Sequence, residues 1–261
     1  NKLNTGFVGT PLLCNVLTEH GMTDLAYRLL LNEEYPGWLH EVKLGATTVW
    51  ERWNSLDENG RISSTGMNSL NHYSYGAVLE WIFRHVAGID VTEQGPGGKM
   101  MRISPKVDYK LGSASAVYDS ASGCYRCGWQ IANGDQITVT VTVPFGAKAQ
   151  VILPYAPDSV YHDTDNPLFE TVENGICCVK AGQYTVTYKA ASPLKKSYSV
   201  DSTLEDLLAE PAIRAFLSNM MEVDMIPDLA YGLTLRQAAE AFAGGVSAEQ
   251  AQRLNALLEE F

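Results

Sequence analysis

The spacing of the hydrophobic residues changes abruptly across residues 91–98. Upstream of this segment, apolar side chains recur at the i, i+3, i+4, i+7 spacing of one helix face, at Tyr75, Val78, Leu79, Ile82 and Val86. Downstream, residues 137–143 read Ile-Thr-Val-Thr-Val-Thr-Val, the period-two alternation of a strand with one buried face. The segment between them contains Gln-Gly-Pro-Gly-Gly, a run of turn-forming residues. The chain must therefore join a helical part to a β-sheet part.

Residues 1–92 are predicted to form a helical domain. Helices are expected to start at four points, namely at Thr10–Pro11 with Thr10 as the cap, at Asp24 with Thr23 as the cap, at Trp38, and at Tyr75. The last helix, closed by Gly88, has the clearest spacing and is expected to be the most regular. A long loop over residues 45–68 precedes it, and long loops often carry functional side chains.

Residues 99–191 are predicted to form an antiparallel β-sandwich. Short runs with strand composition are found at Met100–Ile103, Ser113–Tyr118, Cys124–Ile131, Ile137–Val143, Ala149–Leu153, Ile176–Val179 and Tyr184–Tyr188. The dipeptide Asn133–Gly134 lies between two of these runs and predicts a tight hairpin turn.

Residues 200–261 are predicted to form a small helical appendage. The tail from residue 201 holds 11 acidic and 3 basic residues, a net charge of −8, whereas residues 1–200 carry −3. Capping boxes are expected to start three helices, at Ser202 with Glu205, Thr234 with Gln237 and Ser247 with Gln250, and Pro211 is expected to start a fourth. Since the tail contains no histidine or cysteine, packing or partner contact suits it better than chemistry.

Composition limits the possible partners and cofactors. The formal net charge of −11, without a basic stripe, argues against nucleic acid and against anionic membrane surfaces. The five cysteines are an odd number and do not form a disulfide framework. Cys124 and Cys127 lack the second pair that a zinc ribbon requires, and the adjacent Cys177 and Cys178 would point to opposite faces of a strand. We therefore expect reduced thiols and no metal.

The segment Gly45–Trp53 carries the most suggestive chemistry in the chain. It reads Gly-Ala-Thr-Thr-Val-Trp-Glu-Arg-Trp, so a single carboxylate, Glu51, lies between Trp50 and Trp53. A carboxylate can transfer protons, and indole faces stack on the apolar side of sugar rings. The structural alternative is that both indoles are core residues and that Arg52 forms an ordinary ion pair with Glu51.

This segment belongs to a longer resemblance to the bacterial α-L-rhamnosidase family of inverting glycoside hydrolases. The matching stretches follow the family's order and spacing over nearly all of residues 5–90, at Thr5–Pro11, Asp24–Leu30, Glu34–Trp38, Gly45–Trp53 and Gly66–Gly76. The resemblance implies that residues 1–92 are part of an (α/α)6 toroid. Thr142–Gly146 and Ala149–Pro154 resemble the β-domain that closes such chains.

The resemblance also implies roles for individual residues. In the family, the glutamate of the Trp-Glu-x-Trp segment is the general base that activates water, and the histidine of Asn-His-Tyr contacts the sugar. These roles fall on Glu51 and His72. The substrate would be a rhamnose-containing glycan or glycoside. Beside these two residues, Trp50 and Trp53 are candidate sugar contacts, and Trp38, after the Pro36–Gly37 break, is either a further sugar platform or a core residue. No metal or organic cofactor is implied.

One part of the family pattern does not occur in this chain. The family's general acid lies in an Arg-Asp-Glu-Arg segment followed by Gly-Trp and an Asp, and this sequence contains no such segment. We therefore predict that the chain is the C-terminal portion of a rhamnosidase and does not hydrolyse rhamnosides by itself. Half a toroid leaves apolar helix faces without partners, so we expect the chain to form a homodimer or to pack its helices on its own sandwich.

Two other functions are compatible with the same residues. One is a different glycosidase on the (α/α)6 toroid, such as a glucosidase or a uronate hydrolase, for which the match around Glu51 and His72 would be incidental. The other is a non-catalytic module whose β-sandwich binds glycan or braces a neighbouring domain. Glycan-binding sandwiches often carry a cluster of aromatic residues on one strand face, and the predicted strands show no such cluster, so a structural brace is favoured over a binding module.

Overall fold

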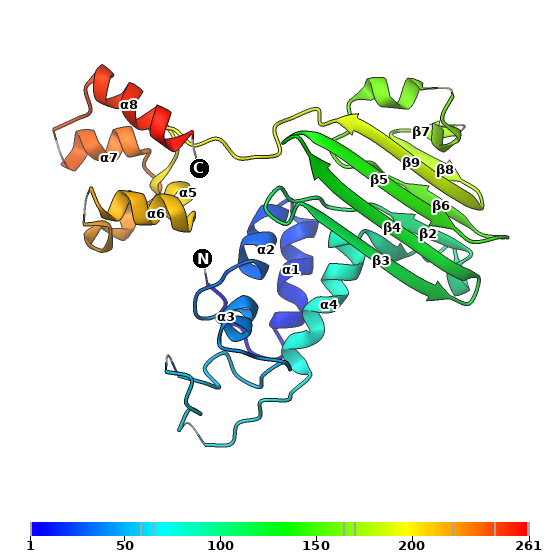
Figure 1. Ribbon diagram of the computed structural model, residues 1–261, viewed down its shortest axis with the longest axis horizontal. Coiled ribbons are helices and arrows are strands. Elements are labelled where there is room, and N and C mark those ends of the chain that lie inside the picture. Colours follow the sequence, from blue (N-terminus) through cyan, green and yellow to red (C-terminus); the bar gives the residue numbers. More distant parts are fainter. Residues whose placement is uncertain are drawn as a thin grey trace. The chain divides into compact units, whose positions relative to one another are not determined.

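The computed structural model describes residues 2–57, 59–64, 66–163, 165–169, 171–220, 222–242 and 244–259. They form two compact units, Lys2–Leu194 and Lys195–Phe261 (Figure 1). The first unit contains both the helical segment and the β-sheets, since the two share one hydrophobic core. The division into residues 1–92, 99–191 and 200–261 stays a prediction.

The helical segment starts with three short helices, α1 (Thr10–Glu19), α2 (Thr23–Leu30) and α3 (Trp38–Lys43). The predicted caps are wrong for the first two. Gly9 occupies the cap position of α1, and the Thr10 hydroxyl donates to the Gly6 carbonyl at 2.9 Å. Thr23 is the first residue of α2 and not its cap. Met22 occupies the cap position and makes no side-chain cap hydrogen bond. Within the described residues, no helix is long and apolar enough to span a membrane.

The last helical stretch of the segment is less regular than its spacing predicts. It consists of a 3-10 turn, η1 (Ser74–Ala77), one turn of α-helix, α4 (Val78–Trp81), and a π-helical turn, η2 (Ile82–Val86). The Ala87 N–H donates to the Ile82 carbonyl at 2.8 Å, an i to i−5 bond that widens the final turn. Gly88 follows with a φ of 82°, and a Cβ there would lie 2.2 Å from the backbone nitrogen of Pro105.

Nine strands in the described residues form two sheets. One has the order β1-β2-β6-β8-β7 and the other the order β3-β4-β5-β9. Their bounds are β1 (Ile89–Val91), β2 (Met100–Ile103), β3 (Ser113–Ser120), β4 (Gly123–Ala132), β5 (Gln136–Val143), β6 (Lys148–Val151), β7 (Val172–Glu173), β8 (Ile176–Val179) and β9 (Gly182–Lys189). All seven predicted strands are confirmed, with ends that differ by up to two residues.

Two features of the sheets differ from the prediction, and the path of the chain between the sheets was not predicted. The strands β1 and β7, of 3 and 2 residues, were not predicted, because segments this short show no alternation. The pair β2 and β6 is parallel rather than antiparallel. The chain leaves the first sheet after β2, forms β3, β4 and β5 in the second sheet, and then returns to the first sheet as β6.

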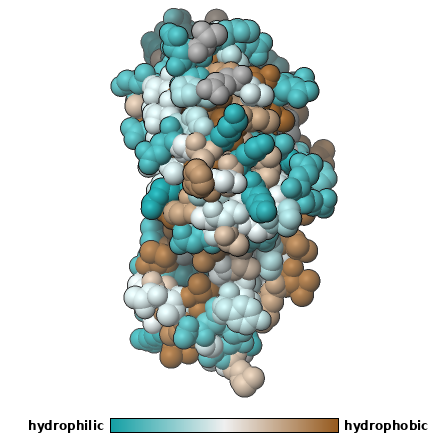
Figure 2. Space-filling model, turned by 90° about the vertical axis from the view of Figure 1, so that its right-hand side faces the viewer, coloured by the Kyte–Doolittle hydropathy of each residue, from teal (hydrophilic) through white to brown (hydrophobic). Residues whose placement is uncertain are grey.

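The alternation in β5 sets the register of the second sheet. Ile137, Val139, Val141 and Val143 are at most 3% exposed, whereas the threonines between them face outward. In the turn that joins β4 to β5, Asn133 and Gly134 have φ values of 52° and 82°, as the predicted hairpin requires. On the face that Figure 2 shows, hydrophobic residues occur in small separate groups among hydrophilic ones.

Buried hydrogen bonds join the helical segment to the sheets. The indole N–H of Trp129, on β4, donates to the Val86 carbonyl of η2 at 2.7 Å. The Tyr27 hydroxyl of α2 donates to the Lys106 carbonyl, in the loop that follows β2. Within the helical segment, the Trp81 indole of α4 donates to the Thr18 hydroxyl of α1 at 2.8 Å. Figure 1 shows α1, α2 and α4 side by side next to the sheets. The helices therefore pack on the sandwich, which was one of the two expected ways of covering them.

The second unit contains short helices around a small apolar core. They are α5 (Leu204–Leu208), α6 (Pro211–Ser218), α7 (Leu235–Phe242) and α8 (Ala248–Leu258). The helix start at Pro211 and the capping boxes at Thr234 and Ser247 are confirmed. The cap of α5 is Thr203 rather than Ser202, because the Ser202 hydroxyl accepts a hydrogen bond from the Ser199 N–H at 3.0 Å.

The link between Trp129 and Val86 can be tested by the variant Trp129→Phe. We expect this variant to lower the free energy of unfolding of the Lys2–Leu194 unit by about 2–4 kcal/mol, because it removes a buried donor and leaves a void. All five tryptophans lie in this unit, so tryptophan fluorescence during urea unfolding reports on it alone.

The control is Gln130→Ala, at the exposed neighbour of Trp129 on the same strand. This change should alter the free energy of unfolding by no more than about 0.5 kcal/mol. If Trp129→Phe lowers the free energy of unfolding by less than about 1 kcal/mol, the structural role of the hydrogen bond between Trp129 and Val86 is contradicted.

Candidate active site

Backbone hydrogen bonds join the segment that contains Glu51 to the segment that contains His72. The segment that follows α3 runs beside residues 69–72, and the Glu51 N–H donates to the Ser69 carbonyl at 2.9 Å. In the other direction, the His72 N–H donates to the Val49 carbonyl at 2.8 Å. The two residues are 21 positions apart in the sequence, and these two bonds place their backbones on neighbouring chain segments.

A buried polar contact fixes the loop between these two segments. The Ser55 hydroxyl, on a residue with 0% exposure, donates to the Asn68 side-chain carbonyl at 2.7 Å. In return, the Asn68 amide donates to the Ser55 backbone carbonyl at 3.0 Å. The Arg52 N–H donates to the same serine hydroxyl at 3.1 Å. The residues next to Glu51 are thus tied to those just before Ser69, and nothing in the sequence singles out Ser55 for this role.

Glu51 and His72 are both half-buried, so neither side chain is sealed in the interior. The imidazole of His72 is stacked on Phe7, with ring centres 4.8 Å apart and 16° between the planes, and on Tyr73 at 5.4 Å and 11°. Its Nδ1 accepts a hydrogen bond from the Ser74 N–H at 3.4 Å. A neutral ring with Nδ1 as acceptor carries its proton on Nε2. Phe7 is a site residue that the sequence prediction did not name, although it lies in one of the matching stretches.

Two of the three predicted tryptophans, Trp38 and Trp53, form part of an aromatic cluster. Trp53 is stacked on Tyr75, with ring centres 4.0 Å apart and 6° between the planes, and Trp38 meets Trp53 edge-on at 5.3 Å. The indole N–H groups of Trp38 and Trp53 donate to the carbonyls of Tyr75 and Thr5, each at 3.0 Å. Trp50 is 3% and Trp53 8% exposed, and Trp38 is half-buried. Protein therefore covers most of Trp50 and Trp53, and sugar binding by these rings stays a prediction.

A second carboxyl lies beneath this site and was not predicted. Glu41, on α3, is 3% exposed, and burial raises its pKa to about 7. The Oε1 atom of Glu41 is buried without a hydrogen-bond partner. The sequence held one signal, because Glu41 follows Trp38 by three residues and so shares its side of the predicted helix.

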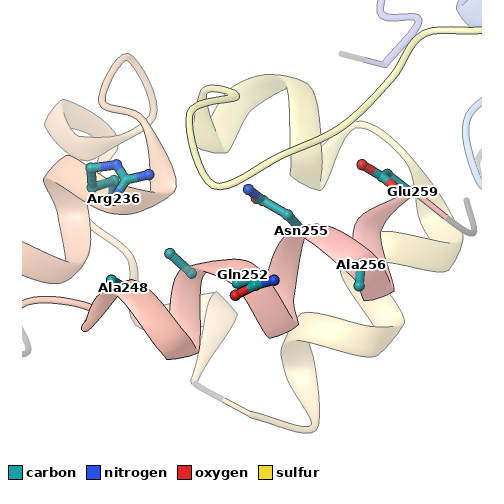
Figure 3. Close-up of a pocket in the computed structure, with 7 residues that line it drawn as sticks. Arg236, Ala248, Gln252, Asn255, Ala256 and Glu259 are labelled. Atoms are coloured by element: carbon teal, nitrogen blue, oxygen red, sulfur yellow. The ribbon is translucent and has the colours of Figure 1, made fainter.

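Two pockets lie away from these residues. One, of about 560 Å³, is in the second unit, where Arg236 of α7 and residues of α8 line it (Figure 3). The other, of about 520 Å³, is on the outer face of β3, β4 and β5. Arg236 is paired with Asp201 at 2.7 Å, and neither pocket contains a histidine or a cysteine. We therefore place the candidate site at Glu51 and His72. The described residues hold no cluster of three or more His, Cys, Asp or Glu suited to a metal ion.

Comparison with protein families assigns both parts of the first unit. Residues 1–86 match the bacterial alpha-L-rhamnosidase 6 hairpin glycosidase domain, and residues 88–166 match the bacterial alpha-L-rhamnosidase C-terminal domain. The boundary between the two matches coincides with the change from η2 to β1.

Similar proteins and structures agree with this assignment. An α-L-rhamnosidase of Alteromonas sp. (strain LOR) is 42% identical over 184 residues, which are 70% of this chain and 19% of that protein. One of Formosa agariphila is 41% identical over 174 residues, 67% of this chain and 18% of that protein. The structure of Streptomyces avermitilis α-L-rhamnosidase complexed with L-rhamnose is 36% identical with a TM-score of 0.64, over 72% of this chain and 18% of that one.

A structure of Aspergillus terreus α-L-rhamnosidase gives a TM-score of 0.60 at 30% identity, over 74% of this chain and 20% of that one. The chain thus spans about a fifth of the length of the relatives that it matches. The order of the elements, helical hairpins followed by two sheets, is the order of the two matched domains. The chain belongs to the bacterial α-L-rhamnosidase family.

Proposed function

We propose that this chain contributes one catalytic carboxylate to an α-L-rhamnosidase that hydrolyses terminal α-L-rhamnosides with inversion. The observation that carries the proposal is the backbone pairing that puts Glu51 and His72, both half-buried, on neighbouring chain segments. The family match and the relative whose structure contains L-rhamnose support a rhamnoside as the substrate.

Glu51 acts as the general base in this proposal. Its carboxylate takes a proton from a water molecule, whose oxygen attacks the anomeric carbon from the face opposite the leaving group. The glycosidic C–O bond breaks, its electron pair goes to the leaving oxygen, and that oxygen takes a proton from a general acid outside this chain. The two carboxyl groups of such an inverting site lie roughly 6.5–9.5 Å apart, which leaves room for the water.

In this proposal, His72 and Trp38 bind the sugar, whereas Trp50 and Trp53 pack around the loop that carries Glu51. With Nδ1 bonded to the Ser74 N–H, a neutral His72 presents an Nε2–H donor for a sugar hydroxyl. Trp38 has more exposed surface than the other two indoles and is the better platform for a sugar ring. Trp50 and Trp53 act mainly by packing around the segment that carries Glu51, with only small parts of their rings left for a ligand.

Glycan binding by the sandwich alone is the second candidate, and one observation favours it. The pocket of about 520 Å³ on β3, β4 and β5 is lined by hydroxyl and amide side chains, at Ser113, Ser115, Gln130, Thr138 and Thr140. Its aromatic residue, Trp129, is 3% exposed and offers no face for stacking. Glycan binding that survives Glu51→Ala and His72→Ala but not a change at Gln130 would favour this candidate.

The catalytic role can be tested in a chimaera. Residues 2–190 would replace the matching part of the Streptomyces avermitilis enzyme, and hydrolysis of an aryl α-L-rhamnoside would be measured. We expect the chimaera to be active, Glu51→Gln to lower kcat by about 10²–10⁴-fold because the base is lost, and His72→Ala to raise KM. The isolated chain should show negligible turnover, since it lacks the general acid.

The control variant of the chimaera is Glu93→Gln, at an exposed carboxylate in the connector after β1, which should keep full activity. A Glu51→Gln chimaera with unchanged kcat would refute the catalytic role. Appreciable turnover by the isolated chain, abolished by Glu51→Gln, would refute the requirement for an outside acid.

The chain also exposes an apolar helix face that we propose a second copy covers. Leu12 and Val16 lie one turn apart on α1 and are 59% and 46% exposed, and Val8, in the turn before the helix, is 84% exposed. Leu79 and Phe83, on α4 and η2, are 57% and 41% exposed, and α1 contacts α4. A face of this kind favours association because burying it removes apolar surface from water.

Light scattering after size-exclusion chromatography measures this association directly. We expect a dimer for the unaltered chain and a monomer for the double variant Leu12→Glu and Val16→Glu, because two carboxylates on this face oppose burial. Val42→Glu, at a 59% exposed position on α3, is the matched control and should remain dimeric. A stable monomer of the unaltered chain would overturn the proposal.

A further inference from the structure

We propose that Phe7 is a positioning residue for His72, whose ring holds the imidazole plane so that the Nε2–H stays directed at the sugar. The proposal rests on the proposed role of His72 as a sugar contact. Phe7 itself needs no contact with the substrate, because its effect reaches the sugar through the imidazole. Phe7 lies 65 positions before His72, so this role links the start of the chain to the candidate site.

The contacts that His72 makes with its own segment leave its ring weakly held. The torsion that rotates an imidazole about its Cβ–Cγ bond has broad minima, so the side chain does not set the ring plane by itself. The hydrogen bond from the Ser74 N–H to Nδ1 is 3.4 Å long, which is beyond the usual range of about 2.7–3.2 Å and therefore weak. Tyr73 is 86% exposed, and among the described residues no ring other than His72 contacts it. Firm support for the ring plane must come from another part of the chain.

The ring of Phe7 provides this support. It is stacked on the imidazole, with ring centres 4.8 Å apart and 16° between the planes, and a stacked neighbour resists tilting of the imidazole. Phe7 also meets Tyr75, with ring centres 5.5 Å apart and 57° between the planes. Tyr75 is 5% exposed and is itself stacked on the buried Trp53. Phe7 thus connects the imidazole plane to the buried aromatic cluster.

Hydrogen bonds on the two preceding residues hold the backbone next to Phe7. The Thr5 carbonyl accepts from the Trp53 indole N–H at 3.0 Å. The Gly6 carbonyl accepts from both the N–H and the hydroxyl of Thr10, at 3.0 and 2.9 Å. Thr10 is the first residue of α1 and is 1% exposed. Phe7 is therefore held by the start of α1 and by the aromatic cluster, independently of the imidazole that it supports.

A fixed ring plane matters for sugar binding because a hydrogen bond depends on direction. Its strength falls steeply once the angle at the hydrogen drops below about 120°. The Nε2–H bond lies in the plane of the imidazole, so a rotating ring turns this donor away from a sugar hydroxyl. A mobile ring must also be ordered when the sugar binds, which costs affinity. Loss of the Phe7 ring should therefore raise KM and leave kcat nearly unchanged.

The first test measures residual dipolar couplings of the two ring C–H bonds of His72, in a weakly aligned sample of the sugar-free chain. These couplings report the direction of the ring and are averaged down when the ring rotates. Phe7→Leu should reduce them while the backbone couplings of residues 70–75 stay unchanged. We expect full ring couplings in the unaltered chain and in Phe7→Tyr, which keeps the stacked ring. The matched control is Phe145→Leu, at a 96% exposed position in the turn after β5, which should also keep them.

The second test asks whether the fixed plane serves the sugar, and it uses the active chimaera with an aryl α-L-rhamnoside. We expect Phe7→Leu to raise KM about 2- to 10-fold, the effect of losing one neutral hydrogen bond. Phe7→Tyr should keep the original KM. In a His72→Ala background, Phe7→Leu should have no further effect, because Phe7 acts only through the imidazole.

Two results would overturn the proposal. One is a set of His72 ring couplings that are already averaged in the unaltered chain or that Phe7→Leu leaves unchanged, and the unaltered chain decides this point even if Phe7→Leu does not fold. The other is a rise in KM from Phe7→Leu that adds to that of His72→Ala. An inactive chimaera with ring couplings that depend on Phe7 would refute the proposed hydrolysis alone. An active chimaera with ring couplings that do not depend on Phe7 would refute the positioning role alone.

Discussion

The pairing of the chain around Glu51 with the chain around His72 is the constraint on which the site depends. Two backbone hydrogen bonds, between Glu51 and Ser69 and between His72 and Val49, set the register of one segment against the other. Backbone bonds hold this register without using the side chains that would meet a substrate. Both side chains therefore remain half-buried and available, while the residues on either side of them make the packing contacts.

The packing around this pairing supports it from two directions. On one side, the stacked rings of Trp53 and Tyr75 and the edge-on ring of Trp38 fill the space between the site segment and η1. On the other side, the Trp129 indole of β4 is bonded to the end of η2, so the helix that begins beside His72 is fixed to the sheet at its far end. The sheets thus serve as a base for the helical segment, and this is a physical reason for finding the two domains together.

Much of the fold could be predicted from the sequence, and the errors have identifiable causes. Alternation marked β5 and its neighbours clearly, because each outward threonine follows an inward aliphatic residue. Spacing predicted a regular helix over Tyr75–Val86, but the wider final turn depends on contacts of Val86 and Gly88 with distant parts of the chain. At the site, the motif around Glu51 could be recognised. Its pairing with the residues near His72, and the buried carboxyl of Glu41, arise from tertiary contacts that spacing does not reveal.

The central claim is that Glu51 and His72 meet one sugar. The most direct measurement is a crystal structure of the chimaera that contains residues 2–190, with L-rhamnose bound. The account predicts that the Glu51 carboxylate is hydrogen-bonded to the sugar or to a water molecule beside its anomeric carbon, and that His72 Nε2 is within hydrogen-bond distance of a sugar hydroxyl. A sugar bound with the Glu51 carboxylate too far away to reach that water would contradict the account.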